Sequence, residues 1–250
     1  MLDVVSGADA LQFIERHLPA LVVCGAIARA AEMLAAIKQT YPAIFVIQAG
    51  GGPGPIVDSY LPEPVGPDEL ITSVRTLLRI KDFEAQLRAA ETRRAFLHGL
   101  MEKLLDRDTV ADVVEIAAES IGRFLGAYRA GLYRVASPDY IEFLHCWTSG
   151  YLPVFGGTES MRALGGKLIG EYRAARTVVV ENIASVTSPR PHAYASIGAP
   201  VLRRGIWEAT MFVHGEAGRR WTEQEVRLVE DVAQLTWDAV RRVWGARGMR

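Results

Sequence analysis

The sequence predicts an α/β chain of two folded units joined by a long helix, and three observations carry this prediction. Short apolar runs at residues 20–25 and 43–49 have the length and composition of buried strands. A seam of apolar residues spaced three and four apart starts at Ile80. Beyond residue 107, strand-like segments separated by turn residues lead into a capped amphipathic helix.

Composition agrees with two units of ordinary domain size. The chain has 250 residues, 50% of them hydrophobic, which is enough for one or two buried cores. Its net charge is −1 and its pI is about 6.5, with no run rich in Lys or Arg, which argues against nucleic acid as a partner. The two cysteines, Cys24 and Cys146, fall one in each half, so we expect neither a disulfide framework nor a metal site.

No segment has the pattern of a membrane span or of a signal peptide. Spanning a bilayer takes roughly 18 or more consecutive apolar residues, and no uninterrupted stretch of the sequence reaches this length. The N-terminus also lacks a basic region followed by an apolar core. We therefore expect a soluble, cytoplasmic protein with no membrane partner.

The first region ends in a motif that is typical of receiver domains. Residues 59–65 read Ser-Tyr-Leu-Pro-Glu-Pro-Val, where receivers of two-component response regulators read Asp-Tyr-Leu-x-Lys-Pro-hydrophobic. Residues 1–79 therefore resemble a receiver domain, and the resemblance implies a flavodoxin-like parallel sheet. Because residues 2–11 resemble the second receiver strand and helix, the first strand and helix are expected to be missing and the sheet shortened.

Three positions depart from the receiver phosphorylation site. Gly25 stands where the phospho-acceptor aspartate belongs, Gln48 where a Thr or Ser belongs, and Glu63 where a lysine belongs. A carboxylate at position 63 repels the dianion that the lysine would attract. Gly25 alone could be an ordinary turn glycine, but together the departures imply that the domain accepts no phosphoryl group. Its role would then be structural or protein-binding, with a signalling partner such as a histidine kinase.

Residues 80–106 are predicted to form a linking helix that continues the helix starting at Pro67. The heptad seam, interrupted at Arg94, consists of Ile80, Phe83, Leu87, Ala90, Leu97, Met101 and Leu104. This seam favours a coiled coil and a parallel homodimer. A helix packed on its own domain would show the same pattern, because the run is shorter than four heptads. His98 is followed by Gly99 and is expected to be a surface histidine.

Residues 107–250 are predicted to form the second unit, which alternates helices with strands. The expected elements cover residues 109–121 (helix), 128–135 and 140–147 (strands), 167–175 (helix), then 177–180, 198–203 and 206–214 (strands). The closing helix starts at Thr222, which forms a capping-box pattern with Glu225.

Two segments of this half resemble GAF domains of bacterial sensor proteins. Residues 175–183 read Ala-Arg-Thr-Val-Val-Val-Glu-Asn-Ile, and residues 221–240 begin Trp-Thr-Glu-Gln-Glu-Val and end Trp-Asp-Ala-Val. The resemblance implies an α+β domain with an antiparallel sheet and a pocket between the sheet and its connecting helices. The chain would then be a non-enzymatic signal-transduction protein, in which the GAF domain senses a small ligand or a partner and the receiver-like domain mediates protein interaction.

Aromatic and polar side chains of this half are candidates for lining the implied pocket. They are Tyr133, Phe143, His145, Trp147, Tyr172, Tyr194 and Trp207. The same side chains could simply fill the core. Regular strand alternation over 143–147 predicts that Phe143, His145 and Trp147 share one face and that Cys146 points to the other.

The sequence specifies no cofactor and leaves three alternative functions open. A covalent bilin needs a cysteine in the excursion before residue 194, which has none, and a haem would need His145 or His192 as its axial ligand. Free methionine sulfoxide reductases share the GAF fold but use several cysteines, so a redox enzyme built on Cys146 is one alternative. The others are the sensory fragment of a GAF-containing histidine kinase and an active response regulator whose first strand lies upstream.

Overall fold

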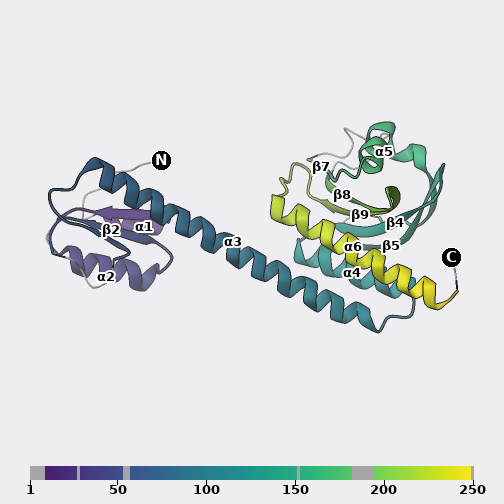
Figure 1. Cartoon of the computed structure of the whole chain (residues 1–250), viewed down its shortest axis with the longest axis horizontal. Helices are drawn as coiled ribbons and strands as arrows, with labels where there is room; N and C mark the ends of the chain where they lie inside the picture. The colour runs from purple at the N-terminus through teal and green to yellow at the C-terminus, as the bar shows by residue number, and fades with distance from the viewer. Residues whose placement is uncertain (1–8, 27–28, 53–56, 151–152, 182–193, 249–250) are drawn as a thin grey trace. The chain divides into compact units, whose positions relative to one another are not determined.

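A computed structural model of the chain describes residues 9–26, 29–52, 57–150, 153–181 and 194–248. The chain divides into two compact units, Met1–Ala90 and Glu91–Arg250 (Figure 1). In chain order, the first unit holds α1 (Ala10–His17), β1 (Leu21–Cys24), α2 (Ala30–Thr40), β2 (Phe45–Ala49), β3 (Ser59–Leu61) and the beginning of α3 (Pro67–Leu105). The predicted domain borders at residues 79 and 106 remain predictions. Helix α3 continues without a break through residue 79 and ends at Leu105, next to the second predicted border.

The first unit is built on a small parallel sheet, as the sequence predicts. Its strands lie in the order β1-β2-β3, and β2 pairs in parallel with both neighbours. Helix α2 covers one face and the first turns of α3 the other, as Figure 1 shows. Leu34 and Ile37 of α2 pack with Val46, whereas Leu77 of α3 packs with Ile47. The strand expected near residue 2 lies outside the described residues.

The second unit is an antiparallel sheet with helices on both faces. Its elements are α4 (Val110–Phe124), β4 (Arg129–Ser137), β5 (Tyr140–Thr148), β6 (Gly157–Ser160), η1 (Met161–Leu164), α5 (Gly166–Arg173), β7 (Val178–Val180), β8 (Ala195–Arg203), β9 (Ile206–Gly215) and α6 (Glu223–Ala246). The six strands lie in the order β6-β5-β4-β9-β8-β7. Figure 1 shows α4 and α6 along one face and α5 on the other. This arrangement confirms the predicted α+β fold of the second half.

The two faces of this sheet carry two separate cores. On the helical face, Val113 of α4 and Val232 of α6 pack with Met211 of β9, and all three are fully buried. Leu100 and Leu104 of α3 join the same core. The core on the other face is smaller and mostly aromatic, and it consists of Tyr133, Ile141, Phe143, Cys146, Met161, Leu164, Leu168, Tyr172, Trp207 and Phe212. This second core holds the candidate site.

The start of α6 is fixed by the capping box that the sequence predicts. The Glu225 backbone N–H donates to the Thr222 hydroxyl at 3.2 Å, and the Thr222 backbone N–H donates to the Glu225 carboxylate at 2.7 Å. Arg219 also donates to this carboxylate at 2.7 Å. These bonds satisfy backbone donors that a helix start leaves open, so the prediction of a helix beginning here is confirmed.

Candidate ligand pocket of the second unit

A small cavity lies within the aromatic core, between the sheet and the η1–α5 segment. Its volume is about 50 Å³. The residues that line it come from β4, β5, β8, β9, α5, η1, the segment before β6 and the residue before β8. They are Tyr133, Phe143, Phe155, Leu164, Leu168, Tyr172, Tyr194, Ser196, Phe212 and His214. The cavity can hold only a few atoms, since pockets for drug-sized ligands measure roughly 300–1,000 Å³.

Two glycines let large rings approach the sheet on this side. A Cβ at Gly198 of β8 would lie 1.9 Å from the Tyr172 hydroxyl oxygen, so only glycine permits this ring position. A Cβ at Gly131 of β4 would lie 2.6 Å from the ring of Phe212. Small residues in the strands therefore make the space that the aromatic side chains of the pocket occupy.

A β-bulge in β5 changes which residues face the pocket. Leu132 of β4 pairs with His145, but the next residue, Tyr133, pairs with Phe143, so one residue of β5 is extra. Phe143 and Cys146 consequently lie together in the aromatic core on the pocket side. The predicted alternation, with Cys146 on the face opposite Phe143, is wrong for this physical reason.

The same bulge places His145 and Trp147 outside the pocket. His145 is half-buried and pairs with Leu132, whose side chain is in the core under the helices, and residues directly opposite in a ladder share one face. Trp147 packs in that helical core, where a Cβ at Gly122 of α4 would come within 2.4 Å of its ring. His145 is therefore not placed as an axial ligand in this pocket, and His192 lies outside the described residues.

The structure brings the other candidate pocket residues together. Tyr133, Phe143, Tyr172 and Tyr194 all line the cavity. Trp207 packs behind it, with its ring 5.3 Å from that of Tyr172, and it donates a hydrogen bond to Thr210 at 2.8 Å. The sequence thus predicts four lining residues and one supporting residue.

A buried arginine that no sequence pattern indicated lies behind this pocket, in contact with some of its lining residues. Arg129, at the start of β4, is 2% exposed. Its Nε donates to Nδ1 of His214 at 3.1 Å, and its Nη1 donates to the carbonyl of Pro153 at 2.7 Å. The guanidinium lies 3.6 Å from the ring centre of Phe155 and 5.1 Å from that of Tyr194. The available signal was a charged residue directly before the apolar run Ala130–Tyr133 of β4.

Burial keeps two titratable groups of this region in their neutral forms. Desolvation, with the neighbouring phenol of Tyr133, raises the pKa of Tyr172 well above its ordinary value. Desolvation also raises the pKa of the Cys146 thiol, although a backbone hydrogen bond from Phe155 and the charge of Arg129 oppose the shift. Tyr172 is therefore a hydroxyl donor, and Cys146 is a thiol and a weak nucleophile.

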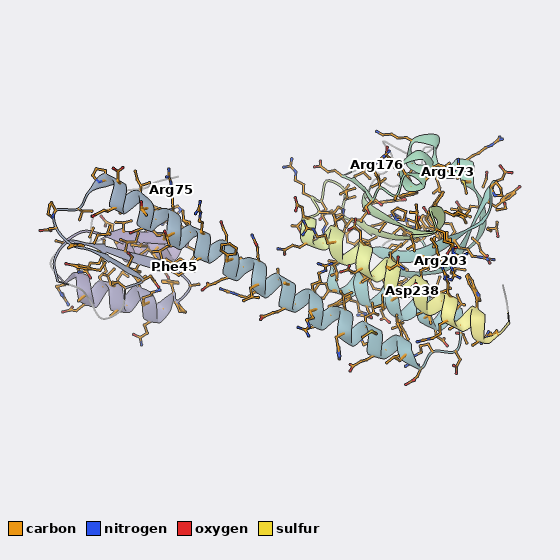
Figure 2. The ribbon with its side chains drawn as sticks, in the orientation of Figure 1. Phe45, Arg75, Arg173, Arg176, Arg203 and Asp238 are labelled. Atoms are coloured by element: carbon orange, nitrogen blue, oxygen red, sulfur yellow. The ribbon has the colours of Figure 1, made fainter. Side chains whose placement is uncertain are left out.

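A second and more open groove lies between β8 and α6, on the helical face. Its volume is about 420 Å³, and it includes Arg203 and Asp238, which Figure 2 labels. The polar groups here largely satisfy one another. Arg241 pairs with Glu208 at 3.2 Å, and Gln234 donates to the Asp238 carboxylate at 3.1 Å. The less open cavity in the aromatic core is therefore the stronger candidate for a ligand site.

The three altered receiver positions meet at one edge of the small parallel sheet. Gly25 follows β1, Gln48 is the second-to-last residue of β2, and Glu63 comes shortly after β3. Gln48 is buried and donates to the carbonyl of Gly52 at 2.8 Å. The Glu63 carboxylate lies against Gly50, where a Cβ would come within 2.2 Å of it. The carboxyl ends of parallel strands are the usual place for a site in such sheets.

Both lysines of the first unit, Lys38 and Lys81, have their contacts away from the three altered receiver positions. Lys81 donates to the carbonyls of Ala20 and Ala43, each at 3.2 Å, just before β1 and β2 begin. Lys38 pairs with Asp58 at 2.7 Å. Among the described residues, neither lysine therefore takes the place of the cation that a receiver has at position 63.

The predicted dimer seam divides into an exposed and a buried part. Ile80, Phe83 and Leu87 are 42%, 69% and 61% exposed, and Ala90 and Met101 are also exposed. Leu97 is half-buried against the helical core, and Leu104 lies inside it at 2% exposure. Leu104 is therefore occupied by its own unit and is not available to a second chain.

Two kinds of feature are not found among the described residues. No group of three or more His, Cys, Asp or Glu side chains is placed to hold a metal ion. None of the helices in the described part of the chain combines the length and the apolar character needed to cross a membrane.

Comparison with known proteins assigns the second unit. The sequence profile of the GAF domain matches residues 109–240, more than half of the chain. Together, the antiparallel sheet, the flanking helices and this match define a sensory-type domain, and the chain belongs to the GAF domain family. The profile match does not include residues 1–108, so the receiver resemblance of the first unit rests on its motifs and its parallel sheet. A search of curated proteins found no match.

Solved structures similar to this chain include GAF-type domains of different function. The chromophore-binding domain of the bacteriophytochrome RpBphP3 from R. palustris matches with a TM-score of 0.52 and 12% identity, covering 61% of this chain and 62% of that domain, less than two thirds of its length. Free methionine-R-sulfoxide reductase from Neisseria meningitidis, in complex with its substrate, matches with a TM-score of 0.52 and 16% identity, covering 64% and 93%. The GAF domain of a phosphoenolpyruvate-protein phosphotransferase from Coxiella burnetii gives 0.52 and 14%, covering 64% and 98%. Identities this low show the fold alone.

Proposed function

We propose that the chain is a non-enzymatic signalling protein of the two-component type, whose GAF unit senses a small ligand. The observation that carries this proposal is the cavity between the sheet and the η1–α5 segment, lined mainly by aromatic side chains with a few hydroxyl groups. Concave, mostly apolar sites with a few convergent polar groups are typical of small-molecule binding. The receiver-like first unit would mediate interaction with a signalling protein such as a histidine kinase.

Polar contacts connect the edge of this unit to the linking helix. Thr177, just before β7, donates to Glu230 of α6 at 2.6 Å. The next residue of α6, Asp231, accepts a hydrogen bond from Arg93 of α3. A ligand that moves β7 or α6 would therefore act on α3, provided that it binds two states of this contact unequally.

Phosphotransfer in the first unit is opposed by the chemistry of its three altered positions. Gly25 has no carboxylate to phosphorylate, and Glu63 places a negative charge where the phosphoryl group would bind. Incubation with acetyl phosphate or beryllofluoride, followed by intact-mass or fluorine NMR measurement, should show no specific uptake. Specific uptake by this unit would contradict the proposal.

We also propose that two copies of the chain form a parallel homodimer through the exposed part of the seam on α3. Ile80, Phe83 and Leu87 expose apolar side chains at heptad spacing on one face of α3. In a parallel pair in register, Arg79 of one copy stands opposite Glu84 of the other at the flanking positions, which favours this orientation.

One observation favours a second candidate function, a redox enzyme built on Cys146. The bulge in β5 places Cys146 on the pocket side of the sheet, and a similar fold occurs in the Neisseria reductase. Burial and the raised pKa of the thiol argue against it. The turnover of oxidised thioethers by the wild type and by the variant Cys146→Ser tests this second function. A turnover that depends on Cys146 would establish the redox function.

The ligand-sensing function is tested by screening small molecules against the full chain. Thermal unfolding with a panel of neutral, anionic and cationic compounds should identify at least one class that raises the unfolding temperature. The control is Phe143→Ala, which removes one wall of the cavity and should abolish the shift. A shift that survives in this variant would place the binding site elsewhere.

A further inference from the structure

We propose that the groove between α3 and α4 is a docking site for a helix of another protein, one that presents an apolar stripe and acidic residues. The groove belongs to the second unit, and residues of α3, of α4 and of the turn between them line it. Its volume is about 700 Å³. The proposal goes beyond ligand sensing, because this surface lies on the helical face of the unit and not at the pocket.

One end and the middle of the groove are apolar. Phe96 of α3 and Phe124 of α4 lie at one end, with their ring centres 4.5 Å apart. Ile116 lines the middle, and Phe124 is 46% exposed. Single exposed apolar residues are common on protein surfaces, but three that line one groove form a patch of the kind that marks an interaction site.

The shape of the groove suits a helix. Ile116, Ser120 and Phe124 follow one another at steps of four residues, so they form one ridge on the surface of α4. This ridge is about 12 Å long, or roughly two helical turns. The small side chain of Ser120 leaves a low point between its two large neighbours. A side chain of a docked helix can enter there, as in the packing of ridges into grooves.

The other end of the groove is positively charged. Lys103 and Arg107 line it, and both are exposed. The Nε of Arg107 donates to the carbonyl of Lys103 at 3.0 Å, which keeps the two residues together. Within the described part of the chain, neither cation pairs with a carboxylate. Arg123 pairs with Glu119 at 2.8 Å, so the lining has a positive excess although the net charge of the chain is −1.

Charge complementarity identifies the chemistry of the partner. An apolar patch that ends at two unpaired cations fits a helix with apolar side chains along one face and Asp or Glu at one end of that face. The groove is also separate from the dimer seam. Phe96 and Lys103 share one side of α3, being seven residues apart, whereas Met101 of the seam is turned about 200° away from Lys103. A homodimer through the seam therefore leaves the groove open to another protein.

The test selects binding peptides for the full chain from two displayed libraries of amphipathic helices, each about 15 residues long. Both libraries vary the apolar stripe among Leu, Ile, Met and Phe, and the polar positions are Glu in one library and Lys in the other. The acidic library should be enriched and the basic library should not. Fluorescence anisotropy then measures the dissociation constant of the best acidic peptide, which should rise with salt concentration because the facing charges are exposed.

Two variants locate the binding site. The double variant Lys103→Glu, Arg107→Glu should weaken the acidic peptide about fivefold to twenty-five-fold, since each exposed ion pair accounts for up to about fivefold. Ser120→Leu fills the low point of the ridge and should weaken binding without a change of charge. The matched control is Arg162→Glu, Lys167→Glu, which makes the same charge change at exposed residues of η1 and α5, on the opposite face of the sheet. This control should leave binding unchanged.

Several results would overturn the proposal. Equal enrichment of the basic library, or no enrichment of either library, would do so. So would an affinity that is unchanged in both the charge-reversed variant and Ser120→Leu, because the peptide would then bind elsewhere. Sedimentation with vesicles of phosphatidylcholine and phosphatidylglycerol gives the last measurement: binding that needs Lys103 and Arg107, without enrichment of acidic peptides, would assign the groove to a membrane surface. None of these results bears on ligand sensing by the pocket, which Phe143→Ala tests separately.

Discussion

Replacement of Gly198 by alanine is the sharpest test of the packing that forms the pocket. The added Cβ would lie 1.9 Å from the hydroxyl oxygen of Tyr172 and 2.9 Å from its ring carbon Cζ. Real Cβ atoms do not come this close, so the Tyr172 ring and α5, which carries it, must move away from β8. Overpacking of this kind costs about 1–3 kcal/mol, and each kcal/mol lowers the unfolding temperature of a domain of this size by roughly 2–4 °C.

Urea unfolding of the full chain, followed by tryptophan fluorescence, measures this cost. Gly170→Ala is the matched control, because Gly170 lies exposed on α5 and a Cβ there meets nothing within 4 Å. That control should be neutral or stabilising by up to about 1 kcal/mol, since alanine favours a helix over glycine. Adding Tyr172→Phe to Gly198→Ala should recover part of the loss, because the closest atom is the hydroxyl oxygen. Wild-type stability of Gly198→Ala would refute the described fit of Tyr172 against β8.

Three further predictions follow from the helices. Phe83→Glu should shift the chain from dimer to monomer in sedimentation velocity, whereas Ile206→Glu, at an equally exposed residue outside the seam, should not; a monomeric wild type at micromolar concentration would contradict the seam. Thr222→Ala should destabilise the second unit by about 1 kcal/mol in urea unfolding, because it removes the cap of α6, and no loss would contradict the capping box. Burial alone would raise the pKa of Glu225, but hydrogen bonds from the Thr222 backbone and from Arg219 lower it overall. Its contribution is therefore present above the ordinary Glu pKa and lost as pH falls through the lowered value, so Glu225→Gln should destabilise at pH 7 and converge with the wild type in acid; a constant difference at all pH values would contradict this.

Local sequence patterns predicted most of the elements because they depend on neighbouring residues. The start of α3 at Pro67, its continuation through the seam, and the capping box at Thr222 are each written in spacings of three or four residues. The β4–β5 hairpin follows from its turn composition in the same way. These features need no knowledge of distant contacts.

The faces of β5 and the role of Arg129 could not be derived in this way. A bulge adds one residue and reverses the alternation beyond it, and nothing in residues 143–147 marks the extra position. Arg129 becomes meaningful only when β9 brings His214 beside it and the segment before β6 brings Phe155. Both depend on contacts between residues far apart in the chain.

Leu104 shows the same limit for the linking helix. Heptad spacing identifies an apolar stripe but not the surface that covers it. Leu104 and Leu100 pack in the core of the second unit, whereas Phe83 stays exposed. One end of the apolar stripe therefore packs in the core of its own unit while the other end stays exposed. Only the tertiary contacts show which residues belong to each part.

Hydrogen exchange of the full chain, measured by mass spectrometry with and without the small molecule that most raises its unfolding temperature, tests the central claim most directly. A ligand in the pocket should slow exchange in α5 and in the strands β8 and β9 that face it, and in the variant Phe143→Ala, which removes one wall of the cavity, this protection should be lost. Protection confined to the first unit, or to the groove between β8 and α6 that holds Arg203, would contradict the account.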